Sequence, residues 1–172
     1  MDVIKDAKGK TQTATGIQEI LNLYKKGYDN RPLDIRLIGQ VTDFAVMEGG
    51  DMVVSGSSSS KRLSCGITIE GVGEDAAVQG FGFLVRNSGN VEFRNFAVMA
   101  FMDDGVSLDT KNCNIWVHNM DIFYGSTGGD SDQAKGDGSV DIKGASTNVT
   151  VSYVHFWDSG KCSLCGMKKT RD

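Results

Sequence analysis

Three carboxylates and two ammonium groups stand out in the second half of the chain as residues that could do chemistry together. The acids are Asp104, Asp137 and Asp141, and the cations are Lys143 and Lys161. Carboxylate oxygens in this number favour a hard cation, and calcium suits a flexible, partly hydrated site. Without a cation, the clustered carboxylates repel one another and their pKa values rise. If the fold brings these residues together, the sequence predicts a calcium site beside two lysines.

Other acids compete for the same role. Asp103, Asp109, Asp130 and Asp132 lie in or near the same loops, and spacing alone does not separate them from the three acids above. An equally simple interpretation makes all of these residues ordinary solvated charges on one face of the fold. Sequence spacing leaves both interpretations open.

The elements that must position these residues repeat from residue 67 onward. Short alternating segments begin at Ile67, Val91, Ile115 and Val149, at intervals of 24, 24 and 34 residues. The ten extra residues of the last interval match a Gly- and Asp-rich insertion around residues 125–136. Two short strands that recur at this period without a helix between them indicate a solenoid of β-coils.

A second series of strands runs out of phase with the first. Its segments begin at Phe83, Val106, Val140 and Cys162, at intervals of 23, 34 and 22 residues. Alternation places the first and third residue of each segment inside, so Cys162 and Leu164 are predicted to face the core. Adjacent coils lie about 4.8 Å apart, which lets side chains distant in sequence converge on the outer face.

Two other architectures fit the repeats less well. Leucine-rich repeats share the period, but their LxxLxLxxN consensus is absent. A β-sandwich would place tight hairpin turns between its strands and would not predict a regular period.

Helical spacing appears once, in Thr15–Lys26. Its apolar residues fall on one face, at positions 17, 20, 21 and 24, and Gly27 can end the helix. Residues 33–41 alternate like a strand. The sequence therefore predicts one short amphipathic helix ahead of the coils.

Composition limits the functional classes. The chain has 172 residues, enough for one domain over residues 1–172, and its 22 glycines and single proline suit a chain that turns often. The net charge of −4 argues against nucleic acid. No apolar run approaches the roughly 18 residues of a membrane span. The first ten residues contain no hydrophobic signal core, which taken literally predicts a cytoplasmic protein.

The pair Cys162 and Cys165 suggests a redox or zinc site. The chain has no second pair of this kind, and His118 and His155 are not spaced as a zinc knuckle. The simpler interpretation makes Cys162 a small apolar residue in a strand.

Several of these segments together resemble the pectate lyases of polysaccharide lyase family 1. Residues 140–146 (VDIKGAS) and 148–153 are similar to the family's strand that carries calcium and substrate ligands. Residues 114–119 (NIWVHN) and 66–73 (GITIEGVG) resemble two further family segments. The resemblance covers most of the chain from about residue 10. It implies an all-β, right-handed parallel β-helix of the pectin lyase-like class with a short N-terminal capping α-helix.

The resemblance also implies roles for individual residues. Asp104, Asp137 and Asp141 become the calcium ligands, and Lys143 and Lys161 match positions that contact substrate carboxylates. In some relatives a further acid stands at the position of Met102, so that ligand is missing here. The implied reaction is calcium-dependent β-elimination in de-esterified polygalacturonate, outside the cell.

The family's base is an arginine in an R-x-P-x-x-R pattern, roughly one coil beyond Lys161. Arg171 arrives too early and lacks the proline, so we expect the base to lie beyond Asp172 and assign no catalytic residue. The resemblance then predicts a domain that is incomplete at its C-terminus, turns over poorly and self-associates through an open coil.

Three alternatives remain. A pectin lyase would act on methylated substrate, but such relatives lack the calcium acids. A non-catalytic carbohydrate-binding or adhesin-like β-helix, or an inactive lyase fragment, is favoured by the missing base. A hydrolase of similar fold would need paired carboxylates, for which Asp103 and Asp104 could serve.

Overall fold

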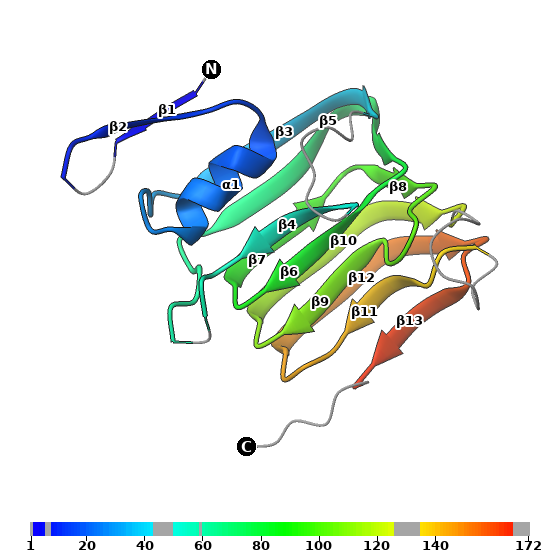
Figure 1. Cartoon of the computed structure of the whole chain (residues 1–172). Helices are drawn as coiled ribbons and strands as arrows, with labels where there is room; N and C mark the ends of the chain where they lie inside the picture. Colours follow the sequence, from blue (N-terminus) through cyan, green and yellow to red (C-terminus); the bar gives the residue numbers. More distant parts are fainter. Residues whose placement is uncertain (1, 6–7, 43–49, 59, 126–134, 167–172) are drawn as a thin grey trace.

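The computed structural model describes residues 2–5, 8–42, 50–58, 60–125 and 135–166. It contains one helix and thirteen strands, and most of the strands belong to stacked coils (Figure 1). The elements are β1 (Asp2–Lys5), β2 (Thr11–Ala14), α1 (Ile17–Lys25), β3 (Leu33–Val41), β4 (Asp51–Ser55), β5 (Ile67–Gln79), β6 (Gly82–Arg86), β7 (Gly89–Arg94), β8 (Ala97–Met99), β9 (Val106–Thr110), β10 (Cys113–Phe123), β11 (Gly138–Ile142), β12 (Thr147–Trp157) and β13 (Lys161–Cys165).

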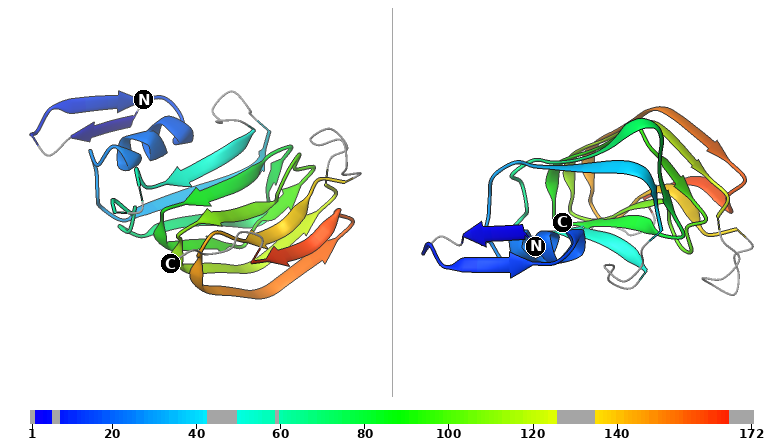
Figure 2. Two further views of the ribbon diagram at one scale, coloured as in Figure 1. Left: turned by 60° about the horizontal axis from the view of Figure 1, so that its bottom comes forward. Right: turned by 90° about the horizontal axis from the view of Figure 1, so that it is seen from above.

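Two parallel sheets form the walls of the coil stack. The six-stranded sheet has the order β12-β10-β7-β5-β3, and β8 pairs with both β10 and β5. The five-stranded sheet has the order β13-β11-β9-β6-β4. The chain alternates between the two sheets, and the end-on view in Figure 2 shows successive turns winding around a common interior. A parallel ladder of this kind needs a connection across the fold at every turn, and the coil supplies it.

The predicted strand columns match the register of the six-stranded sheet. Ile67 lies opposite Val91, Val91 opposite Ile115, and Ile115 opposite Val149. In the five-stranded sheet, Phe83 pairs with Val106 and Val106 with Val140. The inward side chains of these columns form one continuous apolar core, in which all are buried except Val149, which is partly buried.

An asparagine column explains why the turns repeat. Asn90, Asn114 and Asn148 have φ angles of 57°, 58° and 51°, a left-handed conformation that asparagine tolerates better than most residues. Asn114 donates to the side chain of Asn90 at 3.2 Å, and Asn148 donates to that of Asn114 at 3.3 Å. The stacked amides therefore hold one turn of each coil in register with the next.

The last coil departs from the prediction by one residue. The register places Ser163, not Cys162, opposite Val140, so Cys162 and Leu164 do not continue the inward column. Backbone contacts set this register: Lys161 N–H donates to the carbonyl of Asp137 at 2.8 Å, and Gly160 packs against the backbone of Gly136. Cys162 and Cys165 are both exposed, free thiols.

The predicted N-terminal helix and the following strand are confirmed. α1 packs against the start of the coils, with Leu21 and Tyr24 buried, and Gly27 follows its end at φ 75°. β3 has the predicted bounds. The antiparallel pair β1–β2 extends from the α1 end of the stack (Figure 1). Among the described residues, no helix is both long and apolar enough for a bilayer.

Candidate metal and substrate site

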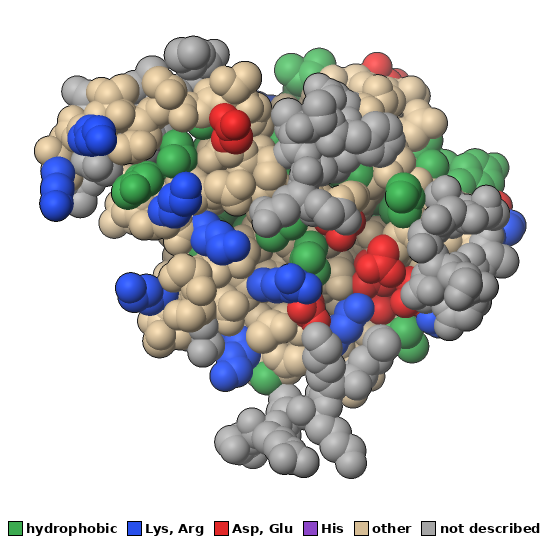
Figure 3. Space-filling view, viewed as in Figure 1, with side chains coloured by type: hydrophobic (Ala, Val, Ile, Leu, Met, Phe, Trp, Pro, Cys, Tyr) green, Lys and Arg blue, Asp and Glu red, His purple; other side chains and the backbone are tan. Residues whose placement is uncertain are grey.

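Two of the three predicted acids, Asp104 and Asp137, meet with Asp103 at one end of the five-stranded sheet, near the start of two strands. Asp103 and Asp104 lie just ahead of β9, and Asp137 immediately precedes β11. Each of the three offers a carboxylate oxygen, and these oxygens lie within 4.8 Å of one another. Parallel pairing of β9 with β11 brings the two strand starts side by side although they are more than thirty residues apart. Figure 3 shows acidic side chains gathered on this face of the molecule.

Asp141 lies in β11, after its central residue, and is 0% exposed. Its Oδ1 atom accepts a hydrogen bond from the Leu164 backbone N–H at 3.0 Å. Its Oδ2 atom is buried without a hydrogen-bond partner among the described residues, although the ammonium of Lys143 lies 3.6 Å away. A buried carboxylate oxygen in this state is costly unless something else binds it.

Gly138 makes room for this carboxylate. A Cβ atom at position 138 would lie 1.9 Å from Oδ1 of Asp141 and 2.5 Å from its Cγ. The Gly138 N–H donates to Oδ1 of Asp104 at 3.0 Å. Gly138 therefore permits Asp141 to fold back along its own strand while it holds Asp104 in place.

Burial and like charge act on the acids in the same direction. Burial, with the charge of Asp104 next, raises the pKa of Asp141 to about 6. Asp51, at the start of β4, has its pKa raised to about 6 by burial and then by the charges of Asp103 and Asp104. This resistance to ionisation is the behaviour predicted for clustered carboxylates without a cation.

The two predicted lysines lie against the acids. Lys143 donates to Oδ2 of Asp104 at 2.8 Å, and Lys161 pairs with Asp137. Burial opposes the charged form of Lys143, but the hydrogen bond and charge of Asp104 outweigh it and raise the pKa of the ammonium. Each lysine thus neutralises one acid of the group.

The interpretation of these acids as ordinary solvated charges does not fit their burial. The exposed fractions of Asp104, Asp137 and Asp141 are 3%, 8% and 0%. Asp109 is also buried, but it pairs with Arg86 at 2.8 Å farther along β9. Asp130 and Asp132 lie outside the described residues, as does Arg171.

Sequence reasoning missed two contributors to this site. Asp51 carries no motif, and only the pairing of β4 with β6 brings it near Asp103 and Asp104. Gly138 is one of 22 glycines, and nothing in its spacing marks it. Both roles depend on contacts between coils.

The group fits a hard divalent cation. Its donor atoms are all carboxylate oxygens, the donor type that calcium prefers. The unpartnered Oδ2 atom of Asp141 is a further oxygen that a cation would satisfy. Asp104, Asp137 and Asp141, with Asp103 beside them, are the residues able to hold it.

On the outer face of the six-stranded sheet, acidic side chains pair with basic ones instead of gathering together. Glu70 lies between Arg36, at 3.0 Å, and Arg94, at 2.7 Å. Arg94 also pairs with Glu92 at 3.1 Å, and Glu92 contacts His118 at 2.9 Å. Arg36, Glu70 and Arg94 lie opposite one another on β3, β5 and β7, so that base, acid and base alternate across these three strands.

Comparison with known families gives one match over most of the chain. The family model described as "Pectate lyase" matches residues 33–172. This range includes both parallel sheets and every residue of the acidic group.

Curated relatives carry the same name. The chain is 34% identical over 113 residues to a probable pectate lyase A of Neosartorya fischeri, covering 63% of the chain and 34% of the relative. It is 32% identical over 136 residues to the pectate lyase plyB of Emericella nidulans, covering 75% of the chain and 40% of the relative. The chain thus spans about a third of the length of such relatives.

A solved structure shares the fold. The pectate lyase Bsp165PelA of Bacillus sp. N165, solved in complex with trigalacturonate, superimposes with a TM-score of 0.73 at 21% identity. The match covers 89% of this chain and 48% of the other. This likeness confirms the predicted fold class, an all-β, right-handed parallel β-helix with a short N-terminal helix.

Proposed function

The chain belongs to the pectate lyase family, and we propose that it carries the cation-binding and uronate-binding part of a site for calcium-dependent β-elimination in de-esterified polygalacturonate. The observation that carries this proposal is the buried Asp141 carboxylate, whose Oδ2 atom has no hydrogen-bond partner beside three converging acids. The setting is outside the cell, as the resemblance to pectate lyases implies.

Asp104, Asp137 and Asp141 are the proposed calcium ligands, and Asp103 lies beside Asp104 and Asp137. Calcium bound there would bridge protein and uronate carboxylates and thereby acidify the proton at C5 of the sugar. The chain's own acids fix where that charge lies, because Gly138 and Leu164 hold Asp104 and Asp141 through backbone hydrogen bonds.

Lys143 and Lys161 have two successive partners in this proposal. Without a cation they neutralise Asp104 and Asp137. With a cation held by those carboxylates, Lys143 and Lys161 would pair with uronate carboxylates instead. The same ammonium groups would offset the negative charge that develops on the sugar when the C5 proton leaves. We assign no described residue as the base that takes this proton.

The test separates calcium-dependent binding from all other binding. Calorimetry with hexagalacturonate is run in calcium and in excess chelator, and the difference in affinity belongs to this site. We expect calcium to tighten binding at least tenfold, and we expect Lys143→Gln with Lys161→Gln to remove most of that gain. Asp104→Asn should also reduce the gain in affinity that calcium gives. Asp121→Asn, which changes an exposed acid on the other sheet, is its matched control.

Activity gives a second readout. Any release of unsaturated product, followed by its ultraviolet absorbance, should be slow, should require calcium and should be lost in Asp104→Asn with Asp137→Asn. Affinity for hexagalacturonate that is equal in calcium and in chelator would overturn the proposal.

A further inference from the structure

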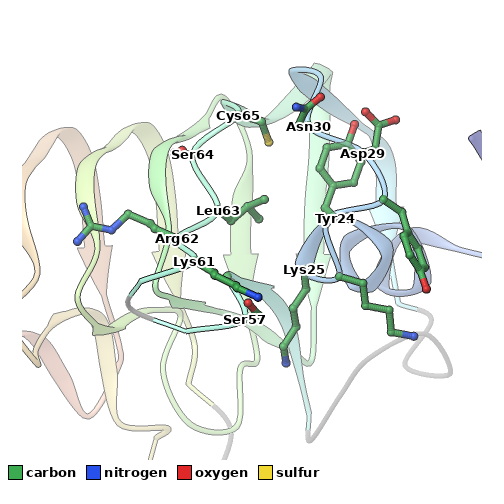
Figure 4. Close-up of a pocket in the computed structure, with 14 residues that line it drawn as sticks. Tyr24, Lys25, Asp29, Asn30, Ser57, Lys61, Arg62, Leu63, Ser64 and Cys65 are labelled. Carbon is green, nitrogen blue, oxygen red and sulfur yellow. The ribbon is translucent and has the colours of Figure 1, made fainter. Parts of the chain in front are cut away.

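A second charged region lies at the other end of the coil stack from β13. A pocket of about 690 Å³ opens between the end of α1 and residues 56–65, which follow β4. Figure 4 shows Lys25 and Lys61 extending toward the same end of this pocket, beside Ser57. Lys26 lines the pocket from the helix, and Arg62 belongs to its wall, although the guanidinium of Arg62 extends away from Tyr24 and Lys25 (Figure 4).

The charge of this pocket is strongly positive in a chain whose net charge is −4. Its lining includes the cations Lys25, Lys26, Lys61 and Arg62. Asp29 also lines it, but that carboxylate is buried and already paired with Arg31 at 2.6 Å. Within the part of the chain that the structure describes, none of the four lining cations forms a salt bridge.

Neutral groups in the pocket suit a sugar more than a simple anion. Asn30, Ser57 and Ser64 supply amide and hydroxyl groups, and the largely buried ring of Tyr24 forms part of the wall. Aromatic faces with a few polar groups are the usual lining of a small-molecule pocket. Cations beside such a lining favour a saccharide that carries carboxylates.

We propose that this pocket binds uronate carboxylates of the pectic polymer directly, without a cation. The inference rests on the proposed function, since it supplies a second contact for the same polymer. β4 lies three strands from β11 in the five-stranded sheet, which places the two regions on the order of 15 Å apart across the strands. Figure 3 shows basic and acidic side chains in separate groups on one face.

The two sites recognise carboxylates by different chemistry. At the acidic group, a uronate carboxylate meets protein carboxylates and needs a cation between them. At the pocket, it meets lysine side chains and needs no cation. Chelator therefore removes the first contact and leaves the second, while methyl esterification of the sugar removes the charge that the pocket binds.

The experiment is calorimetry with hexagalacturonate in excess chelator at low ionic strength. The pocket variant carries Lys25→Gln, Lys26→Gln and Lys61→Gln. The matched control carries Lys8→Gln, Lys10→Gln and Lys111→Gln, which remove the same charge from exposed sites outside the pocket. We expect the affinity of the pocket variant to fall about tenfold and that of the control to change less than about twofold. Hexagalacturonate that is fully methyl-esterified should not bind.

Three results would overturn the inference: no binding in chelator, equal weakening in both triple variants, or equal binding of the methyl-esterified ligand. Calcium titration of the pocket variant separates this failure from that of the proposed function. If calcium still binds at the acidic group while binding in chelator is absent, only the pocket is rejected. All of the substituted side chains are exposed, so the variants should retain the wild-type unfolding temperature.

Discussion

The two parallel sheets of this chain share the same coils but distribute charge in opposite ways. On the six-stranded sheet, Glu70 lies between Arg36 and Arg94, and each charge has an opposite neighbour one strand away. On the five-stranded sheet, burial raises the pKa values of Asp51 and Asp141, and the charge of Asp104 raises both of them further. Stacked coils bring equivalent positions within about 5 Å, so a column of charges either alternates or repels.

This difference predicts opposite responses to pH. Arg94, by its hydrogen bond to Glu70, lowers the pKa of that carboxyl. The contribution of Glu70 to stability is therefore present above its ordinary pKa, and it is lost as the pH falls through the pKa of Glu70 in the folded protein. Asp51 and Asp141 have folded pKa values of about 6, above their ordinary values. Their contribution is present below the ordinary pKa and is lost as the pH rises through about 6. The charges on the six-stranded sheet thus stabilise the fold most at neutral pH. The acids on the five-stranded sheet stabilise it most at acid pH unless a cation is bound.

The largest expected effect comes from closing the space beside Asp141. Gly138→Ala places a methyl group where the Asp141 carboxylate lies, and we expect unfolding free energy to fall by about 2–3 kcal/mol. Chemical denaturation in the absence of calcium measures this loss. Calcium affinity should fall as well, because the carboxylate must move.

A double variant checks the cause of that loss. Asp141→Ala removes the side chain that the methyl group strikes, so Gly138→Ala should cost much less in the Asp141→Ala background. An equal cost in both backgrounds would mean that the effect arises elsewhere in the strand.

A smaller effect of opposite sign is expected for Asp141→Asn. Asparagine keeps an oxygen for the Leu164 N–H but carries no charge, so we expect the calcium-free protein to gain about 1–2 kcal/mol at pH 7. The gain should shrink toward pH 4, where the wild-type carboxyl is protonated. Denaturation curves at both pH values measure it, and a loss of stability at pH 7 would show that Lys143 compensates the charge fully.

The smallest effect is expected on the other sheet. Glu70→Gln removes the carboxylate shared by Arg36 and Arg94, and we expect the unfolding temperature at pH 7 to fall by a few degrees at most. The difference from wild type should vanish as the pH falls below the pKa of Glu70. A difference that instead grows on acidification would contradict the proposed contrast between the sheets.

Sequence periodicity predicted the repeating parts of the fold well. The columns through Ile67, Val91 and Ile115 depend on regular spacing, and each coil repeats the same local turn. The last coil was predicted one residue out of register because Cys162 and Leu164 are apolar and Ser163 is not. Backbone contacts of Gly160 and Lys161 set that register, and they leave no mark in hydropathy.

Residues of the candidate site could be predicted only where a motif or a regular spacing in the sequence indicated them. Asp104, Asp137 and Asp141 came from spacing and resemblance, and the structure brings them together with Lys143 and Lys161. The full burial of Asp141 was not predictable, because it depends on the close approach of Gly138 and on coverage by the next coil. Asp51 was missed because its neighbours lie two strands away in the sheet.

Calcium titration of the metal-free chain at pH 7 tests the central claim most directly. Calorimetry compares the wild type with Asp141→Asn, and with Glu70→Gln as the control from the other sheet. The account predicts one calcium site that Asp141→Asn weakens at least tenfold and that Glu70→Gln leaves intact. Calcium binding that is absent from the wild type, or that Asp141→Asn leaves unchanged, would contradict it.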